Sequence, residues 1–464
     1  MGANIPKDTT HSFSSEETVS VEKTNSGAQK PQESLSATQK LWKHIDTRLI
    51  TGFTPAYYAS VMGTGISANI LYNFVFPARW LQVCGRIMAV ISLTLFVVLL
   101  VLFVTALFRN RLLLHKVHCD TAMAPFMGCM VMGYTSLVMF LDAATDKLWG
   151  MALFVLWWIA SVMSFYTGFV TFFASTIGKH RKTANALDPA NISMLFLLPV
   201  VTLTVSLSCG GLLVPKLDST QLKIITMIIC FIMWAVAVIL AFIVVLVNFW
   251  RLFVHKIPPS AQVMTMFLPI GFLGQGALAI LLFGRNCFTV LLQNKDTAST
   301  SSYLYFMTHT AQSNNVDVSD ISMMLATSIM MVCTINALAL ISFGFFFTFV
   351  AIASTLAKMA PFAQKRNAAA MYSPKSESKF KGMFSGFIRF HRGFWAMTFP
   401  LGTMATSNGQ LYSLFHGFEA FRYISAIYAC LLFIITIGCL CGVVYRCIAI
   451  VADVSHTKPE ESQV

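Results

Sequence analysis

Residues 53–66, FTPAYYASVMGTGI, open the first long hydrophobic run of the chain with a phenylalanine beside a proline and with no charged residue. The same combination returns in four later runs: MAPFMGC (123–129), FLLPVV (196–201), FLPIGFLGQG (267–276) and TFPLGTM (398–404). The first four prolines are 70, 74 and 70 residues apart, and the last interval is 131 because two polar inserts, near 285–320 and 358–392, lengthen it. A fixed period of this length indicates one structural unit that is used repeatedly.

A second apolar run lies between each proline and the next, so the repeated unit is a helical hairpin. The ten runs fall at about 54–76, 80–108, 121–141, 148–177, 190–213, 220–250, 260–284, 321–357, 393–415 and 417–450. Each is near or above the roughly 20 residues that a helix needs to cross a hydrocarbon core of about 30 Å. The sequence therefore predicts an all-α integral membrane protein with ten transmembrane helices, arranged as five helical hairpins with quasi-five-fold symmetry. Five parallel proline-bearing helices around one axis would enclose a central pore.

The composition of the chain is that of a membrane protein. Hydrophobic residues make up 56% of it, charged residues only 11%, and the mean hydropathy is +0.70, values that exclude an ordinary soluble domain. Residues 1–45 are rich in Ser, Thr, Glu, Lys and Gln, which predicts a disordered N-terminal tail. We expect the transporter domain to span 46–450 and a short C-terminal tail to occupy 451–464.

Basic residues are distributed unevenly between the two sets of loops. The loops that follow runs two, four, six and eight contain sixteen Lys and Arg residues, against five in the loops on the opposite side. Because basic loops remain in the cytosol, both tails are predicted to be cytosolic, with an extracellular loop at 285–320 and a basic cytosolic loop at 358–392. The net charge of +13 is therefore mainly a topology signal, without the basic patch of a nucleic-acid-binding face. The cytosolic charges would also attract anions to the inner mouth, a role that we assign to Arg389 and Arg392.

The five proline-bearing runs contain no Asp, Glu, Lys, Arg or His. Ionisable residues inside membranes are the usual parts of proton relays and ion-coupled carriers, so these helices are not expected to hold a proton relay. A neutral bore of backbone dipoles, hydroxyls and aromatic rings suits an anion that is bound weakly enough to leave again. The chain also lacks the paired carboxylates, histidine cluster or nucleophile of an enzyme site. We therefore expect a transporter with no catalytic residue, metal or cofactor.

Proline removes a backbone donor and tends to bend a helix unless it lies in the first turn. Pro55 and Pro125 are expected in first turns, whereas Pro199, Pro269 and Pro400 are expected deeper, where they would kink their helices. Two readings remain open for the residues around them. Glycines either let helices pack closely or expose bent backbone to the pore, and hydroxyls either bond to the carbonyl one turn earlier or line the path.

Each proline-bearing run also carries a phenylalanine near its proline, and rings that converge on one axis would close a pore by their volume and by excluding water. The alternative for each ring is ordinary core packing, in a chain with 40 phenylalanines. Phe399, directly before Pro400, is the predicted gate. The predicted lining of the substrate path comprises Phe53, Gly63, Thr64, Phe126, Phe196, Ser206, Phe267, Gly271, Thr398, Pro400 and Thr403.

Three stretches carry a resemblance to known transporters: FTPAYYASVMGTGISANILYNFVFPARWL (53–81), NFWRLFVHKIPPSAQVMTMFLPIGFLGQG (248–276) and FHRGFWAMTFPLGTM (390–404). Over about 50–450 the chain resembles the tellurite-resistance/dicarboxylate-transporter family, which includes slow anion channels, and it is most similar to the fungal sulfite efflux pumps within that family. The resemblance implies five hairpins around a central pore, with Phe399 as the ring that occludes it. It also suggests a homo-oligomer in the membrane lipid, with a trimer as the form of the relatives.

The leading hypothesis is export of sulfite or bisulfite, small inorganic anions, across the plasma membrane, which would give sulfite tolerance. A potential that is negative inside drives anions outward by about 2.3 kcal/mol per charge per 100 mV, so efflux needs no coupling within the helices. The alternative is a malate or related dicarboxylate transporter, because one fold serves several substrates. Larger anions would need a wider bore and fixed cationic contacts, which the proline-bearing runs do not supply.

Overall fold

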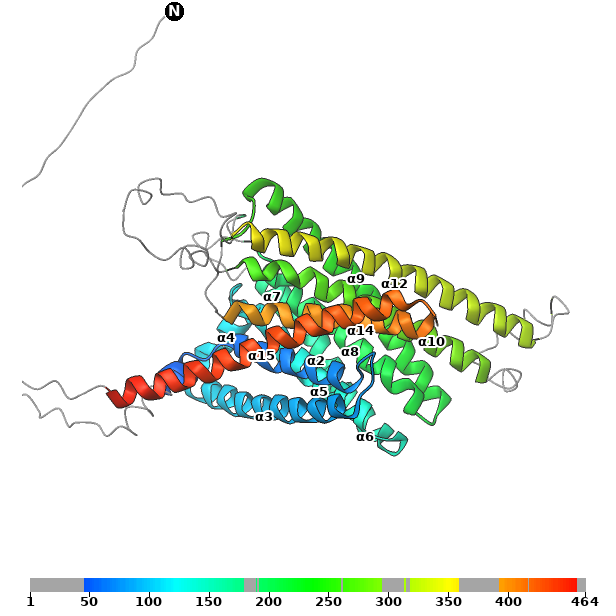
Figure 1. Ribbon diagram of the computed structural model, residues 1–464, viewed down its shortest axis with the longest axis horizontal. Helices are drawn as coiled ribbons and strands as arrows, with labels where there is room; N and C mark the ends of the chain where they lie inside the picture. The colour runs from blue at the N-terminus through cyan, green and yellow to red at the C-terminus, as the bar shows by residue number, and fades with distance from the viewer. Residues whose placement is uncertain are drawn as a thin grey trace, which may run out of the picture.

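The computed structural model describes residues 46–178, 189, 192–259, 262–293, 313, 318–358, 392–415 and 417–456. Within these residues every regular element is a helix. The two ends of the described chain, η1 (Asp46–Thr51) and the last turns of α15 (Glu419–His456), lie at the same end of the helical bundle (Figure 1). An even number of crossings would produce this arrangement.

The five proline-bearing segments form one class of helix, which we call the inner helices: α2 (Ala59–Tyr72), α5 (Met127–Ala144), α8 (Leu197–Leu213), α10 (Leu268–Gln293) and α14 (Trp395–Leu414). A short 3₁₀ turn precedes each of them: η2 (Pro55–Tyr58), η3 (Ala124–Phe126), η8 (Met194–Phe196), η10 (Val263–Phe267) and η13 (Arg392–Phe394). The last residue of every one of these turns is a tyrosine or a phenylalanine. The sequence repeat is thus also a repeat of local structure.

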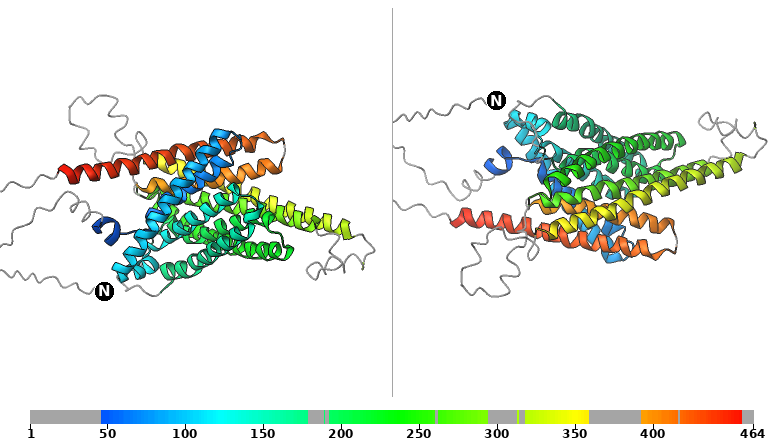
Figure 2. Two further views of the ribbon diagram at one scale, coloured as in Figure 1. Left: turned by 90° about the horizontal axis from the view of Figure 1, so that it is seen from below. Right: turned by 90° about the horizontal axis from the view of Figure 1, so that it is seen from above.

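An outer helix follows each inner helix and contacts it: α3 (Arg79–Arg109), α6 (Gly150–Phe165) with η5 (Tyr166–Thr171) and α7 (Phe172–Thr176), α9 (Thr220–His255), α12 (Val318–Leu356) and α15. The shorter elements are α4 (Arg111–Cys119), η4 (Lys147–Trp149) and η9 (Val214–Lys216). The views in Figure 2 show the long helices running side by side along roughly one direction.

The inner helices contact one another in a closed order, α2 to α5, α5 to α8, α8 to α10, α10 to α14, and α14 back to α2. The burial of the helices agrees with this order. In the segments that contain α8 and α10, 94% of the most apolar 18-residue stretch is buried, against 17% of the corresponding stretch of α3. Outer helices face the surroundings with exposed apolar side chains, which suits contact with lipid. The inner helices therefore form the centre of the bundle.

Within the described part of the chain, eight segments are long and apolar enough to cross a membrane: Arg79–Arg109, Ala124–Ala144, Lys147–Thr176, Met194–Lys216, Thr220–His255, Val263–Gln293, Ser322–Leu356 and Glu419–Ala449. These make the chain a multi-pass membrane protein. The inner helices α2 and α14 are not among the eight, and α14 carries the polar run TSNGQ at 406–410. The count of ten crossings therefore stays a prediction.

Glycines lie where inner helices approach most closely. A Cβ atom added to Gly128 of α5 would lie 2.5 Å from the carbonyl oxygen of Leu198 in α8, and one added to Gly274 of α10 would lie 2.8 Å from the Oγ1 atom of Thr403 in α14. Side chains larger than hydrogen would push these helices apart. The close-packing reading of the glycines accounts for these positions.

Two details differ from the sequence-based expectations. Pro199 is the third residue of α8 and Pro269 the second of α10, so both lie in a first turn, and only Pro400 lies well inside its helix. The expected depth of the first two was wrong because the 3₁₀ turns before these helices were not foreseen. Asp142 lies within α5, so this inner helix does carry a charge near its end.

Segment boundaries also shift. Helix α10 continues to Gln293 and α12 begins at Val318. Both ends of the predicted extracellular loop at 285–320 are therefore helical. Helix α15 continues to His456, into the predicted C-terminal tail. The predicted tail at 1–45 and residues 359–391 of the predicted basic loop lie outside the described residues.

Candidate functional site

Phe399 lies in the interior of α14, directly before the proline at position 400. Its side chain is 3% exposed, and Gly271 of α10 lies against its ring. One turn later, the hydroxyl of Thr403 donates to the carbonyl oxygen of Pro400 over 2.8 Å. Pro400 thus lies between Phe399 and the hydrogen-bonded Thr403 in α14, the inner helix that contacts both α10 and α2.

The phenylalanines of the five runs do not share one level. Phe126, Phe196 and Phe267 each end a 3₁₀ turn, and the corresponding residue before α14 is Phe394. Phe399 follows Phe394 by five residues, which is about 7.5 Å of helix at 1.5 Å per residue. Phe399 therefore lies deeper along the inner ring than the aromatic residues at the helix starts.

These other rings have separate surroundings. Phe53 is 1% exposed and packs on Phe103 of the outer helix α3, with ring centroids 5.4 Å apart. Phe196 is buried and Phe126 is half-buried. Phe267 lines an apolar groove of about 600 Å³, which also contains residues of α12, α14 and α15. A role in the path for these four rings stays a prediction.

The hydroxyls of the predicted lining donate to nearby backbone. Thr64 donates to the carbonyl of Ser60, and Thr398 donates to that of Trp395, both over 2.8 Å. Ser206 of α8 instead meets a hydroxyl of the outer helix, with 3.1 Å between its Oγ atom and that of Ser161. Bonding to helix carbonyls was one of the two readings left open, and it describes Thr64, Thr398 and Thr403 in this structure.

The predicted glycines face neighbouring inner helices. A Cβ atom on Gly63 would lie 2.5 Å from the Oγ1 atom of Thr398, and one on Gly271 would lie 3.3 Å from Cγ of Pro400. Both glycines thus bring another inner helix against α14. Of the two predicted inner-mouth arginines, Arg392 begins η13, and Arg389 lies outside the described residues.

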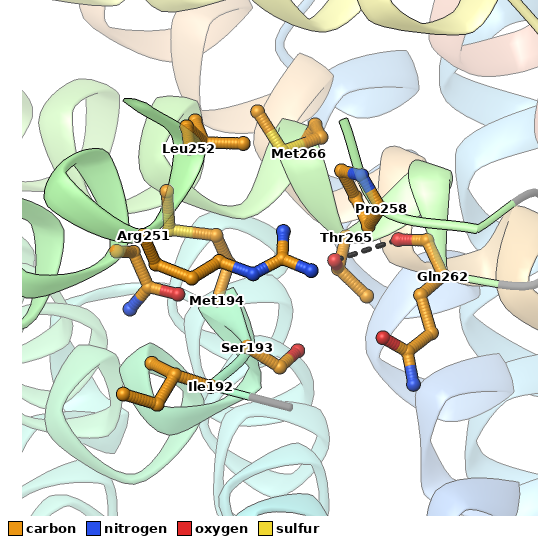
Figure 3. A pocket seen from close by; sticks show the side chains of 10 residues that line it. Ile192, Ser193, Met194, Arg251, Leu252, Pro258, Gln262, Thr265 and Met266 are labelled. Carbon is orange, nitrogen blue, oxygen red and sulfur yellow. Dashed lines mark hydrogen bonds between the residues drawn. The ribbon is translucent and has the colours of Figure 1, made fainter. Parts of the chain in front are cut away.

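A pocket that the sequence did not single out lies where the inner helices α8 and α10 begin. Arg251, near the end of α9, is 6% exposed and extends its guanidinium into this pocket between Ser193 and Thr265 (Figure 3). Its Nη1 atom donates to the carbonyl oxygen of Lys256 over 3.4 Å. Lys256 has a φ of 61°, so Arg251 braces the strained end of α9.

Arg251 is one of the sixteen Lys and Arg residues counted above in the predicted cytosolic loops, where it contributed only to the predicted orientation. The signal available in the sequence was its spacing from Asn248, because polar residues three apart lie on one face of a helix. The structure buries both side chains. A buried cation at the entrance to the inner ring adds positive potential there.

Comparison with known proteins identifies the family. The family model described as voltage-dependent anion channel matches residues 52–444. The chain belongs to this family. The match covers every inner helix and reaches into the last outer helix.

Individual relatives agree with this membership. A sulfite efflux pump of Candida albicans is 35% identical over 405 residues, which is 85% of this chain and 74% of the relative. A sulfite efflux pump of Saccharomyces cerevisiae is 28% identical over 418 residues, covering 81% and 83%. An uncharacterized transporter of Methanocaldococcus jannaschii is 26% identical over 245 residues, covering 51% and 66%. The predicted resemblance to the fungal sulfite efflux pumps is confirmed.

Proposed function

We propose that this member of the voltage-dependent anion channel family exports sulfite or bisulfite across the plasma membrane and so confers tolerance to sulfite. The observation that carries the proposal is the 35% identity to the Candida albicans sulfite efflux pump over 85% of the chain. The two fungal relatives both carry this name, which favours sulfite over the dicarboxylate alternative.

The path of the anion runs along the axis of the inner ring. The closed order of contacts among the inner helices supports this route, with all ten helices crossing as five hairpins around the pore. Asp142, the ionisable residue within α5, is paired with Lys216, whose Nζ atom lies 3.1 Å from its Oδ1 atom. One other charged residue lies on the described inner helices, Arg285 of α10, and its side chain is exposed. An anion inside the ring therefore meets no fixed counter-ion that would hold it too tightly to leave.

Phe399 is the gate of this path. Its deep position before Pro400 supports the assignment, because a buried ring in the middle of a closed helical ring blocks water and ions by its volume. Helix α14 has a missing backbone hydrogen bond at Pro400, which gives the segment around the ring a place to bend. Both tails lie in the cytosol in this proposal, and the protein works as a homo-oligomer, with a trimer as the expected form.

Flux measurements in proteoliposomes test the proposal. We expect sulfite flux that responds to an imposed voltage in the direction of anion movement, and little malate flux. Malate flux without sulfite flux would replace the proposal with the dicarboxylate alternative. A voltage-independent sulfite flux that requires a proton gradient would retain the substrate and overturn passive movement.

A further inference from the structure

Gln275 lies in the middle of the inner helix α10 and is 1% exposed. Neither its Nε2 nor its Oε1 atom has a hydrogen-bond partner among the residues that the structure describes. An unpaired buried amide destabilises the folded state, and native proteins keep few such groups. A buried amide without hydrogen bonds lowers the stability of the protein, so its presence at this position suggests a functional role.

The face of α10 that carries Gln275 points into the inner ring. Gly271, Gln275, Leu278 and Leu282 follow one another at spacings of three or four residues, so they form one stripe on the helix. Contacts locate both ends of this stripe, because Gly271 lies against Phe399 and Leu282 lies against Gly211 of α8. The outward face is marked by Gly276, whose carbonyl oxygen accepts a hydrogen bond from Trp234 of the outer helix α9.

The side-chain donors around this stripe are already used. Thr403 donates to Pro400, and on α8 the hydroxyls of Thr204 and Ser208 donate to carbonyls of their own helix. A hydroxyl whose hydrogen is already donated to a backbone carbonyl can offer only its lone pairs, and lone pairs repel an anion. The Gln275 amide differs, because its two N–H groups are not engaged by any protein acceptor.

No other described residue of the inner helices or of the 3₁₀ turns before them combines an unpaired N–H donor with a position on this stripe. Asn408 lacks a partner only for its acceptor oxygen, since its amide nitrogen donates to Met404. Tyr58 has an unpaired hydroxyl, but its ring packs on Phe96 and Phe103 of the outer helix α3. Gln275 is thus the unpaired N–H donor on the stripe that faces the ring.

We propose that the side-chain amide of Gln275 coordinates the permeating anion, one helical turn beyond the contact between Gly271 and Phe399. The inference rests on the proposed transport of a small oxyanion such as sulfite. A neutral amide donates hydrogen bonds to the oxyanion without adding a charge that would trap it. The anion reaches the amide when Phe399 moves aside, because the side chain is fully enclosed while the ring is in place.

Two substitutions and a matched control test the inference. Gln275→Leu removes the donors while keeping the approximate volume, and Gln275→Glu replaces them with a group that accepts hydrogen bonds and repels anions when ionised. Gln82→Leu makes the first change on the outer helix α3, where the side chain is half-exposed. Each variant is reconstituted for flux of sulfite, chloride, nitrate and malate, and the purified protein is melted with and without sulfite.

We expect Gln275→Leu to lower sulfite flux at least tenfold and to abolish the sulfite-dependent rise in melting temperature. Without sulfite it should melt at or above the wild-type temperature, because it removes an unpaired buried amide. Gln275→Glu should lower the flux further, and Gln82→Leu should change neither readout. A Gln275→Leu variant that melts several degrees lower would show a structural amide and overturn the inference, as would unchanged sulfite flux in both Gln275 variants.

The anion panel separates this inference from the proposed function. If the wild type carries another anion and Gln275→Leu loses that flux, the coordination site stands and sulfite export fails. If the wild type carries sulfite and both Gln275 variants carry it equally well, sulfite export stands and the coordination site fails. If no anion moves but sulfite still stabilises the wild type and not Gln275→Leu, the binding site stands without transport; an absence of both effects overturns it.

Discussion

The ring of Phe399 rests on the bare backbone of Gly271. A methyl group at Gly271 would lie 3.7 Å from Cδ1 of Phe399 and 3.3 Å from Cγ of Pro400. The first distance is ordinary van der Waals contact and the second is tight, so a methyl group at Gly271 would fill the space against the Phe399 ring and crowd Pro400. This space is where the ring meets a neighbouring inner helix.

Gly271→Ala should therefore restrict the movement of Phe399 without unfolding the protein. We expect anion flux to fall several-fold, because the added methyl group removes free volume beside the ring. The measurement is sulfite flux in proteoliposomes at matched protein content. Gly276→Ala is the control on the same helix, since its Cβ atom would lie 3.5 Å from Leu340 of the outer helix α12. Equal loss of flux in both variants would mean that the effect comes from the helix and not from the ring.

Phe399→Ala should raise anion leak at rest while the protein stays folded. Removing a buried phenylalanine costs about 3–5 kcal/mol of stability, so the melting temperature will also fall. Phe272→Ala serves as the control, because Phe272 is equally buried but packs edge-to-face on Phe242 of the outer helix α9. We expect comparable destabilisation in the two variants and a leak only in Phe399→Ala. Unchanged or reduced flux in a well-folded Phe399→Ala protein would refute the gate.

The all-helical membrane class was accessible from sequence because lipid imposes it. Outer helices must be apolar where they face hydrocarbon, and the regular recurrence of proline marked the inner helices. The direction of individual side chains was not accessible. Helix α8 is buried on every side, so it has no polar face to distinguish the ring interior from the outer helices, and Ser206 was placed in the path although it meets Ser161.

Neutral polar residues were also hard to judge. Gln275 was quoted within the motif FLPIGFLGQG, but an amide carries no charge and no periodic signal that separates a bonded from an unbonded group. Whether its N–H groups have partners depends on which residues of α8 and α14 lie opposite, and these contacts join segments far apart in the chain. The deep position of Pro400, and of Phe399 beside it, was expected, whereas the depths expected for Pro199 and Pro269 were wrong. The 3₁₀ turns that set the register of each helix leave little trace in hydropathy.

Ser206→Ala should leave anion flux within about twofold of the wild type. Its hydroxyl interacts with Ser161 and lies toward the outer helix α6, so its loss costs about 1 kcal/mol of stability and removes no contact to the anion. Sulfite flux and melting temperature are the two readouts. A large loss of flux with normal stability would return Ser206 to the path and would require a different orientation of α8.

Neutralising Arg389 and Arg392 with glutamine should lower flux more at low substrate than at saturation. Attraction of anions by a basic mouth raises their local concentration, and salt screens this attraction over about 10 Å at 0.1 M. The loss should therefore shrink as ionic strength rises. Flux measured over a grid of sulfite and salt concentrations checks both trends. A uniform reduction at every concentration would assign these arginines another role.

Lys216→Met should destabilise the protein strongly, because it leaves the Asp142 carboxylate of α5 without its cation. Lys216 follows α8, and its Nζ atom contacts the carboxylate and the carbonyl oxygens of Asp142 and Thr145. The two side chains are only 20% and 10% exposed, and breaking one partner of a buried pair typically costs about 3–5 kcal/mol. The same substitution at Lys147 is the control, since its ion pair with Asp218 is exposed and such pairs contribute little.

The double variant Asp142→Leu/Lys216→Met decides whether the loss is electrostatic. Replacing both partners with apolar side chains removes the unpaired charge, so the double variant should melt well above Lys216→Met. Thermal unfolding in detergent and in lipid gives the comparison, with Lys147→Met close to the wild type. If the double variant melts no higher than Lys216→Met, then the lysine stabilises the end of α5 through its bonds to the backbone carbonyls, and the ion pair itself contributes little.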